Sequence, residues 1–253
     1  MDQRKSVVFH VQRRDNGRAE PRWDEFVVPW QDGATVASCL QWLAIHPTLS
    51  NGQLATPPGW EANCLEDSCG ACAMLINGRV QQACSTRIDQ LPDTDEPIKL
   101  APMSKFPVIR DLVVDRSRFS GDLQRVKAWI PLDGAYDLGP GPEVSPAAQQ
   151  RRYRLSQCTQ CGCCLEACPQ YGRGGAFVGA AVVSQARLFN EHNVGAELKS
   201  ERLEEMMKKG GVHDCAKSAN CVAVCPKEIP LMESIAAMSG QVTMQAIREF
   251  FST

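Results

Sequence analysis

Five cysteines lie within eleven positions of residues 157–169, which read QCTQCGCCLEACP. Thiolates packed this densely hold iron or zinc, and a zinc site rarely needs four of them in tandem. The spacing C-x2-C-x2-C-x3-C, which starts at Cys158, is one in which the first three cysteines bind one cubic iron-sulfur cluster. The fourth cysteine, Cys168, then binds a different cluster. This segment therefore predicts two clusters.

A second cysteine run, further along the chain, indicates what the two clusters are. It reads C-x5-C-x3-C-P from Cys215, and Ser218, a poor iron ligand, stands where the first run has its middle cysteine. If the runs exchange their last cysteines, one cluster has four thiolates and suits 4Fe-4S, while the other has three and suits 3Fe-4S. The sets are then Cys158, Cys161, Cys164 and Cys225 for 4Fe-4S, and Cys168, Cys215 and Cys221 for 3Fe-4S. A low-temperature paramagnetic resonance signal from an oxidised 3Fe-4S centre would test this hypothesis.

A third set of cysteines precedes both runs. Cys64, Cys69 and Cys72 have the spacing of a plant-type 2Fe-2S loop, and Cys84 can supply the fourth thiolate from a neighbouring strand. Gly70, inside the loop, is small enough to let backbone N–H groups approach the bridging sulfides, which tunes the reduction potential. The alternative is a structural zinc ion held by the same four cysteines.

The elements around this loop predict a small sheet with one helix. Alternating apolar residues and turn signals predict a hairpin, a second hairpin that carries Cys84, and a last strand. An amphipathic helix, which Pro47 ends, places Cys39 on its buried face as an apolar side chain and not a ligand. The expected ranges are strands 5–14, 22–30, 73–76, 80–83 and 98–101, and helix 35–46. This order is typical of a β-grasp ferredoxin.

Helical periodicity dominates the rest of the chain. Val108, Ile109, Leu112 and Val113 have helical spacing, so the domain boundary is expected at residue 105. A Pro/Gly-rich connector over 131–146 is followed by predicted helices at 147–157, 177–190, 200–209 and 231–251. The fold class is α+β: a β-grasp 2Fe-2S domain, 1–105, precedes an α-helical ferredoxin domain, 106–253, with the 4Fe-4S and 3Fe-4S clusters.

Composition excludes several classes of function. With 253 residues, a net charge of −2 and a pI near 6.1, nothing points to nucleic acid. The 13 cysteines fit a reducing compartment, and neither a signal peptide nor an apolar run of membrane-spanning length is expected. No phosphate loop, Ser/His/Asp set or H-E-x-x-H pattern occurs. We expect a protein that carries electrons and has no substrate site of its own.

One 2Fe-2S loop followed by two interleaved cysteine runs resembles the iron-sulfur subunit of succinate dehydrogenase and fumarate reductase over essentially the whole chain. The segments CGACAMLINGRV, PVIRDLVVDRSRF and CVAVCPKEIP are each similar to their counterparts in that family. The resemblance implies the same ligand sets as the cysteine count, with Cys163 as a non-ligand.

The resemblance also implies the function. Electrons would pass one at a time from FAD in a flavoprotein subunit, which holds the dicarboxylate site, through the 2Fe-2S, 4Fe-4S and 3Fe-4S clusters to a quinone at a membrane anchor. The reaction would be succinate oxidation in the tricarboxylic acid cycle, or its reverse as quinol:fumarate reduction. Two alternatives remain open. The chain could carry electrons through a similar row of clusters for another dehydrogenase, or it could be a binding module stabilised by zinc.

The residues expected near the quinone differ from those of the ubiquinone-reducing members of the family. Where those members carry a Trp pair and a His, this chain has Gln170-Tyr171-Gly172 and Ala216. The segments QARLFN and GGVHDC and the ending AIREFF look more like the branch with a di-haem cytochrome b anchor and menaquinone. That branch implies a peripheral position on the cytoplasmic face of the bacterial inner membrane. Tyr171 and Arg173 are the candidate contacts to quinone or anchor.

Overall fold

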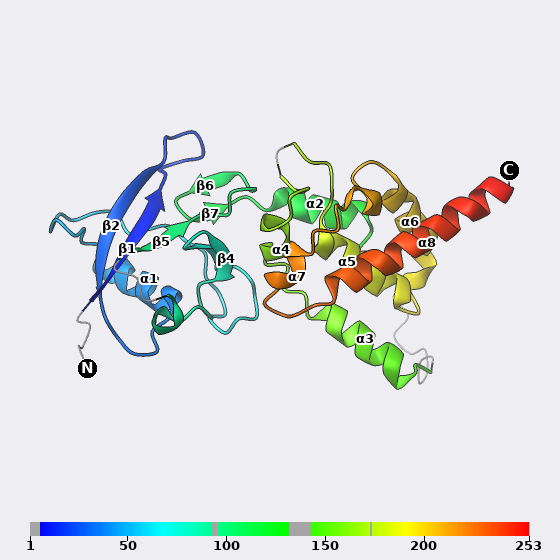
Figure 1. The fold of residues 1–253 in the computed structure, drawn as a ribbon, viewed down its shortest axis with the longest axis horizontal. Helices are drawn as coiled ribbons and strands as arrows, with labels where there is room; N and C mark the ends of the chain where they lie inside the picture. The colour runs from blue at the N-terminus through cyan, green and yellow to red at the C-terminus, as the bar shows by residue number, and fades with distance from the viewer. Residues whose placement is uncertain (1–5, 93–95, 132–142, 173, 253) are drawn as a thin grey trace. The chain divides into compact units, whose positions relative to one another are not determined.

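The computed structural model describes residues 6–92, 96–131, 143–172 and 174–252, and packing divides the chain into two compact units. The first unit extends to Arg116 and includes the separate segment 159–166, and the second unit contains 117–158 and the residues from 167 onward. Figure 1 shows that the first unit is rich in strands and the second in helices. The fold class expected from the sequence is thereby confirmed, while the boundary at residue 105 stays a prediction.

The first unit is built on a five-stranded sheet with the order β2-β1-β5-β3-β4. Its strands are β1 (Ser6–Arg13), β2 (Arg22–Pro29), β3 (Ala73–Ile76), β4 (Arg79–Gln82) and β5 (Ile98–Ala101). β1 pairs antiparallel with β2 and parallel with β5, as a β-grasp sheet requires, and β3 and β4 form a tight hairpin. All five strands confirm the expected ones; Lys5, in the first expected range, lies outside the described residues.

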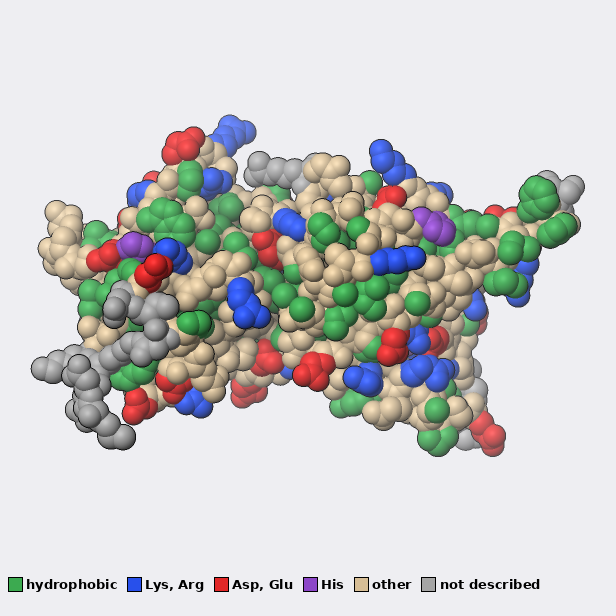
Figure 2. Space-filling model, in the orientation of Figure 1, with side chains coloured by type: hydrophobic (Ala, Val, Ile, Leu, Met, Phe, Trp, Pro, Cys, Tyr) green, Lys and Arg blue, Asp and Glu red, His purple; other side chains and the backbone are tan. Residues whose placement is uncertain are grey.

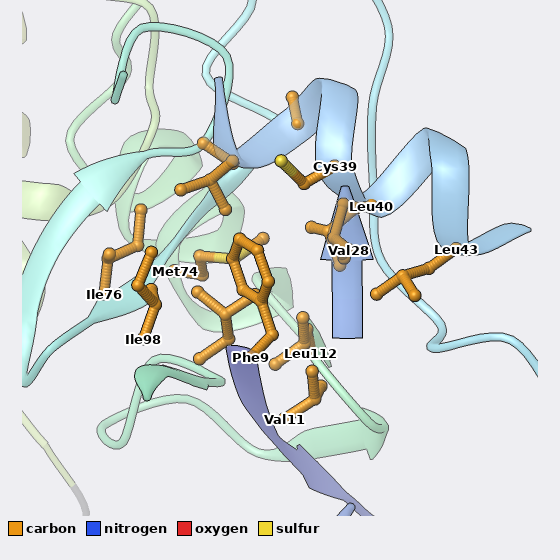
Figure 3. Close-up of a cluster of buried hydrophobic side chains, with 14 of the residues drawn as sticks. Phe9, Val11, Val28, Cys39, Leu40, Leu43, Met74, Ile76, Ile98 and Leu112 are labelled. Atoms are coloured by element: carbon orange, nitrogen blue, oxygen red, sulfur yellow. The ribbon is translucent and has the colours of Figure 1, made fainter. Parts of the chain in front are cut away.

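Helix α1 (Val36–Ile45) packs its apolar face on this sheet. It begins with a capping box in which Thr35 Oγ1 accepts from Ser38 N at 3.1 Å and Ser38 Oγ accepts from Thr35 N at 2.9 Å. Figure 3 shows side chains of α1, among them Cys39, beside Phe9 of β1. Cys39 is 3% exposed, and burial raises the pKa of its thiol to about 11, so the expectation of an apolar filler is confirmed.

The helical expectation for residues 108–113 is wrong. This segment forms a two-stranded sheet, β6 (Val108–Arg110) and β7 (Val113–Val114). The turn between them depends on Asp111, whose φ is +46° and whose carboxylate accepts from Gly59 N at 2.8 Å and Arg14 N at 2.9 Å. Contacts that distant in the sequence override a local periodicity of branched residues, which also favour strands.

The second unit is helical and is organised around α5 (Ala180–Glu191), which contacts α2, α3, α6 and α8. Most of α5 is buried, which explains why its apolar residues are not confined to one face. The surrounding helices are α2 (Ser117–Arg125), α3 (Pro146–Ser156), α6 (Lys199–Met207), the short α7 (Asn220–Ala223) and α8 (Leu231–Ser252). The predicted helices over 147–157, 177–190, 200–209 and 231–251 are thus confirmed. Most of the predicted connector lies outside the described residues.

Buried Arg202 of α6 crosslinks the second unit. Its guanidinium donates to Gly195 O at 2.6 Å, Lys127 O at 2.9 Å and Trp129 O at 2.9 Å, and its exposed fraction is 0%. These bonds fix the chain that follows α2. Among the described residues, no helix combines the length and the apolar character needed to cross a membrane.

Candidate iron-sulfur centres

The loop that begins at Cys64 directs backbone N–H groups at a sulfur atom. Cys64 Sγ accepts from Glu66 N at 3.3 Å, Ser68 N at 3.3 Å and Cys69 N at 3.2 Å. These bonds lower the pKa of the Cys64 thiol to about 7, the Glu66 N–H contributing most. The loop therefore stabilises the thiolate form, which is the form that binds iron.

The backbone conformation explains how one sulfur collects three donors. Leu65 and Asp67 have φ of +59° and +56°, a left-handed conformation that is costly for residues with a side chain. Alternation of left- and right-handed residues turns successive N–H groups into one concavity, which suits an anion. Non-glycine residues held in this conformation indicate a loop shaped for a ligand.

The four predicted 2Fe-2S ligands lie in two pairs. The Cys64 and Cys69 side chains interact, as do those of Cys72 and Cys84. The β3–β4 hairpin makes the second pair, because Ala83 N donates to Cys72 O at 3.1 Å. Burial raises the pKa of the Cys72 thiol to about 12. Two thiol pairs match a cluster in which each of two irons takes two thiolates, so the donor set fits the group.

The segment 159–166 belongs to the first unit, although it carries cysteines of the run that begins at Cys158 in the second unit. Helix α4 (Cys163–Glu166) ends in a buried carboxylate that accepts from Ser104 N at 3.0 Å, Ser104 Oγ at 2.6 Å and Lys105 N at 3.0 Å. Glu166 thus fastens the segment to the chain that follows β5. Cys161 and Cys164, both buried, are held against the same unit as the 2Fe-2S loop.

Cys161 is the most acidic of the thiols with a resolved shift. The Cys163 thiol contributes most to lowering the pKa of Cys161 to about 6, with smaller contributions from Thr159 and from the charge of Arg116. Cys163 was predicted as a non-ligand, and its position beside Cys161 gives it a supporting role. The thiolate of Cys161 is therefore available at neutral pH.

The three predicted 3Fe-4S ligands lie together in the second unit. Burial, and then the negative charges of Cys215 and Cys168, raise the pKa of Cys221, which places the three sulfurs within electrostatic reach of one another. Asn220 Nδ2 donates to Ala167 O at 3.2 Å and so ties α7 to the Cys168 segment. Like-charged thiolates held together require a cation, and three of them fit three irons.

The loops after Cys215 and Cys225 also direct a backbone N–H group at a cysteine sulfur, as the loop after Cys64 does. Lys217 N donates to Cys215 Sγ, and Ile229 N donates to Cys225 Sγ, each at 3.4 Å. Lys217 and the residue before Ile229, Glu228, have φ of +57° and +50°. Cys158 and Cys225 lie in the second unit, and Cys161 and Cys164 in the first, so the assignment of these four to one cluster stays a prediction.

Tyr171 is not an open contact site. It is 3% exposed, and the guanidinium of Arg118 lies 4.3 Å from the centre of its ring. Arg118 also donates to Gly172 O at 2.7 Å and to Gly175 O at 2.8 Å. Arg118 and Tyr171 therefore stabilise the backbone at these two glycines. The other candidate contact, Arg173, lies outside the described residues.

Sequence reasoning missed two charged residues beside the cysteine loops, Glu166 and Arg116. Arg116 donates to Ala71 O at 3.0 Å and to Glu61 Oε2 at 2.7 Å. Nothing in the local pattern separates either residue from an exposed charge. A charge at the edge of a cysteine run was the one available signal.

The described part of the chain has no three His, Cys, Asp or Glu side chains grouped as a single metal ion requires. A cluster spreads its cysteines over several irons, so wider spacing of the thiols is expected for it. The paired and tripled cysteines described above have the number and chemistry of cluster ligands.

Two family models match the chain: a 2Fe-2S iron-sulfur cluster binding domain over residues 8–121, and a 4Fe-4S dicluster domain over 154–229. The chain is 48% identical over 253 residues to the succinate dehydrogenase iron-sulfur subunit of Bacillus subtilis, covering 100% of this chain and 99% of that one. It is 30% identical to the fumarate reductase iron-sulfur subunit of Haemophilus influenzae, covering 83% of this chain and 82% of that one.

Among solved structures, a chain of the Mycobacterium smegmatis Sdh1 complex in the apo form matches with a TM-score of 0.79. The match covers 96% of this chain and 98% of that chain at 24% sequence identity. At that identity the likeness shows a shared fold.

Proposed function

The chain belongs to the family of iron-sulfur subunits of succinate dehydrogenase and fumarate reductase, and from this premise we propose that it carries electrons from a flavoprotein subunit to a membrane anchor. The flavoprotein would hold FAD and oxidise succinate, and the anchor would hold the quinone. The observation that carries the proposal is the 48% identity, over the whole chain, to a succinate dehydrogenase subunit. The bound clusters supply one-electron chemistry, which divides the electron pair that a flavin accepts.

We propose eleven cysteines as the cluster ligands. Cys64, Cys69, Cys72 and Cys84 would bind 2Fe-2S; Cys158, Cys161, Cys164 and Cys225 would bind 4Fe-4S; Cys168, Cys215 and Cys221 would bind 3Fe-4S. The thiol pairs, the thiol triplet and the N–H bonds to sulfur support these sets. About nine iron atoms per chain are expected.

The backbone of this chain tunes the potentials. Plant-type 2Fe-2S centres lie near about −400 mV, which is low for accepting electrons from succinate. The N–H groups around Cys64, and Asp67 N, which donates to Cys84 Sγ at 3.3 Å, stabilise the added negative charge of the reduced form. These bonds raise the potential toward that of the donor.

Fumarate reduction is the alternative direction. Relatives that are named fumarate reductase iron-sulfur subunits, at 30–34% identity, favour it as the second candidate. Comparing both reactions in the purified complex decides between them. The proposed direction requires succinate-dependent quinone reduction to be the faster one.

We further propose a di-haem cytochrome b anchor, menaquinone and a position on the cytoplasmic face of the bacterial inner membrane. The sequence at Gln170-Tyr171-Gly172 and Ala216 supports this branch. An apolar end of α8 supports docking to another subunit: Met244, Ile247, Phe250 and Phe251 are 45–81% exposed, and Figure 2 shows hydrophobic side chains gathered there. Counting haem and extracting quinone from the purified complex tests both finer assignments.

The electron path is tested by Cys215→Ala in the whole complex. We expect quinone reduction to be lost while succinate-dependent reduction of a dye that accepts electrons at the flavin is retained. Cys39→Ala, in the hydrophobic core, is the matched control and should retain both activities. Equal loss of both activities in Cys215→Ala, with the flavoprotein still bound, would contradict the proposed path.

A further inference from the structure

Arg116, two residues after β7, attaches a positive charge to the 2Fe-2S loop. Its Nη2 donates to Ala71 O at 3.0 Å, and Ala71 lies between the proposed ligands Cys69 and Cys72. Its Nη1 pairs with Glu61 Oε2 at 2.7 Å. The loop thus has a fixed cation on one side.

The same loop touches the segment that carries ligands of the next cluster. Gly70 has φ of +73°, and a Cβ at that position would lie 2.7 Å from Cys161 Cα and 2.7 Å from Cys161 Cβ. Only a residue without a side chain permits this approach. The Arg116 charge also acts electrostatically on the Cys161 sulfur. One guanidinium therefore bonds to the 2Fe-2S loop, and its charge also reaches a proposed ligand of the second cluster.

The Arg116 charge is only partly neutralised by its ion pair with Glu61. The Arg116 side chain is 21% exposed, while that of its partner Glu61 is 40% exposed and is therefore better screened by water. Arg116 Nε is buried, and within the described residues no acceptor lies in hydrogen-bond range of it. A buried cationic N–H without an acceptor is costly unless an anionic neighbour compensates it.

We propose that Arg116 is a positioning residue shared by two clusters: it fastens the 2Fe-2S loop and raises the reduction potentials of the 2Fe-2S and 4Fe-4S clusters together. The inference rests on the proposed ligand sets. An electron added to either cluster is stabilised by the same cation, because the two loops meet at Gly70 and Cys161. Arg116 bonds to Ala71 and Glu61 of the first unit, whereas the proposed 3Fe-4S ligands all lie in the second unit.

The test is a redox titration of the purified complex followed by paramagnetic resonance. For Arg116→Gln we expect the reduced-to-oxidised ratios of both clusters at a fixed potential to fall about tenfold, or about 59 mV for a one-electron couple. The 3Fe-4S midpoint should not move. Arg116→Lys should restore most of the shift, because it keeps the charge and loses only the planar fork.

Two further variants keep the test decisive. Glu61→Gln removes the opposing carboxylate and should move both midpoints in the opposite direction. Arg79→Gln removes a charge at the far end of the β3–β4 hairpin, several residues along the strand from Cys84, and should move neither. If Arg116→Gln does not assemble, the sign of the Glu61→Gln shift decides.

Unchanged 2Fe-2S and 4Fe-4S midpoints in Arg116→Gln or in Glu61→Gln, with all clusters present, would overturn the inference and leave the ligand sets intact. Failure of the ligand sets has a separate signature. In that case Cys161→Ser would leave the 4Fe-4S signal and the iron content unchanged.

Discussion

Replacing Glu166 by glutamine should loosen the segment 159–166 from the first unit. The carboxylate now accepts three hydrogen bonds, two at Oε1 from Ser104 and one at Oε2 from Lys105 N. The glutamine amide has only one acceptor oxygen. Its NH2 group must therefore take the place of one carboxylate oxygen and face the donors of either Ser104 or Lys105. That loses at least one bond to a charged group, about 1.5–3 kcal/mol, and weakens the others by removing the charge.

We therefore expect Glu166→Gln to lower the free energy of unfolding by about 2–3 kcal/mol, and Tm by roughly 4–12 °C. Tm is measured by circular dichroism, together with the rate at which cluster absorbance bleaches. Hydrogen exchange at Ser104 N and Lys105 N reports the broken contact directly. Glu204→Gln, on the exposed side of α6, is the matched control and should change Tm little.

A Tm for Glu166→Gln equal to that of Glu204→Gln, with unchanged exchange at Ser104 N and Lys105 N, would refute this reasoning. It would mean that the first unit holds the segment through its apolar contacts alone. Those contacts include Gly162, where a Cβ would lie 3.2 Å from Phe106 Cζ.

Three further outcomes are expected. Burial of Asp111 raises the pKa of its carboxyl, but N–H groups of Gly59 and Arg14 and the charge of Arg13 outweigh it and lower that pKa. The stabilisation that ionised Asp111 contributes is therefore complete above about pH 4 and is lost as pH falls through its folded pKa. On acidification, the Tm of Asp111→Asn should fall less than the Tm of the parent. Parallel curves of Tm against pH would count against this. Arg202→Met removes a buried cation from its carbonyl acceptors and should lower the free energy of unfolding by about 3–5 kcal/mol, measured by thermal unfolding. A Tm within about 2 °C of the parent would correspond to a loss on the order of 1 kcal/mol or less and would contradict this expectation. Changing the exposed Phe250 and Phe251 to serine should leave Tm unchanged and reduce co-purification with the membrane anchor; full recovery of the complex would remove α8 from the interface.

Local patterns predicted most of the elements because each has a local cause. The hairpin with Asn77-Gly78 at its turn and the apolar face of α1 depend on residues close together in the sequence. The cysteine spacings worked for the same reason, since a loop of fixed length presents thiols to a small group. The match to two cluster-binding family models bears out the 2Fe-2S and 4Fe-4S cofactors.

The errors and omissions share a different cause. The strands around Asp111 were expected as a helix, because the partner that fixes the turn, Arg14, is 97 residues away in the sequence. Glu166 meets Ser104 across 62 residues, and Arg116 meets Ala71 across 45. A buried charge resembles an exposed one in the sequence, and only the fold identifies its partner.

The membership of segment 159–166 in the first unit sets an order for synthesis on the ribosome. When Arg116 has emerged, Met103 and Phe106 still lack the backbone of Gly162 against which they pack, and Ser104 lacks its carboxylate partner. The first unit therefore stays unfinished until residue 166 has been translated. The first unit can therefore reach its final packing, with Cys161 in place, only after a stretch of the second unit has been made.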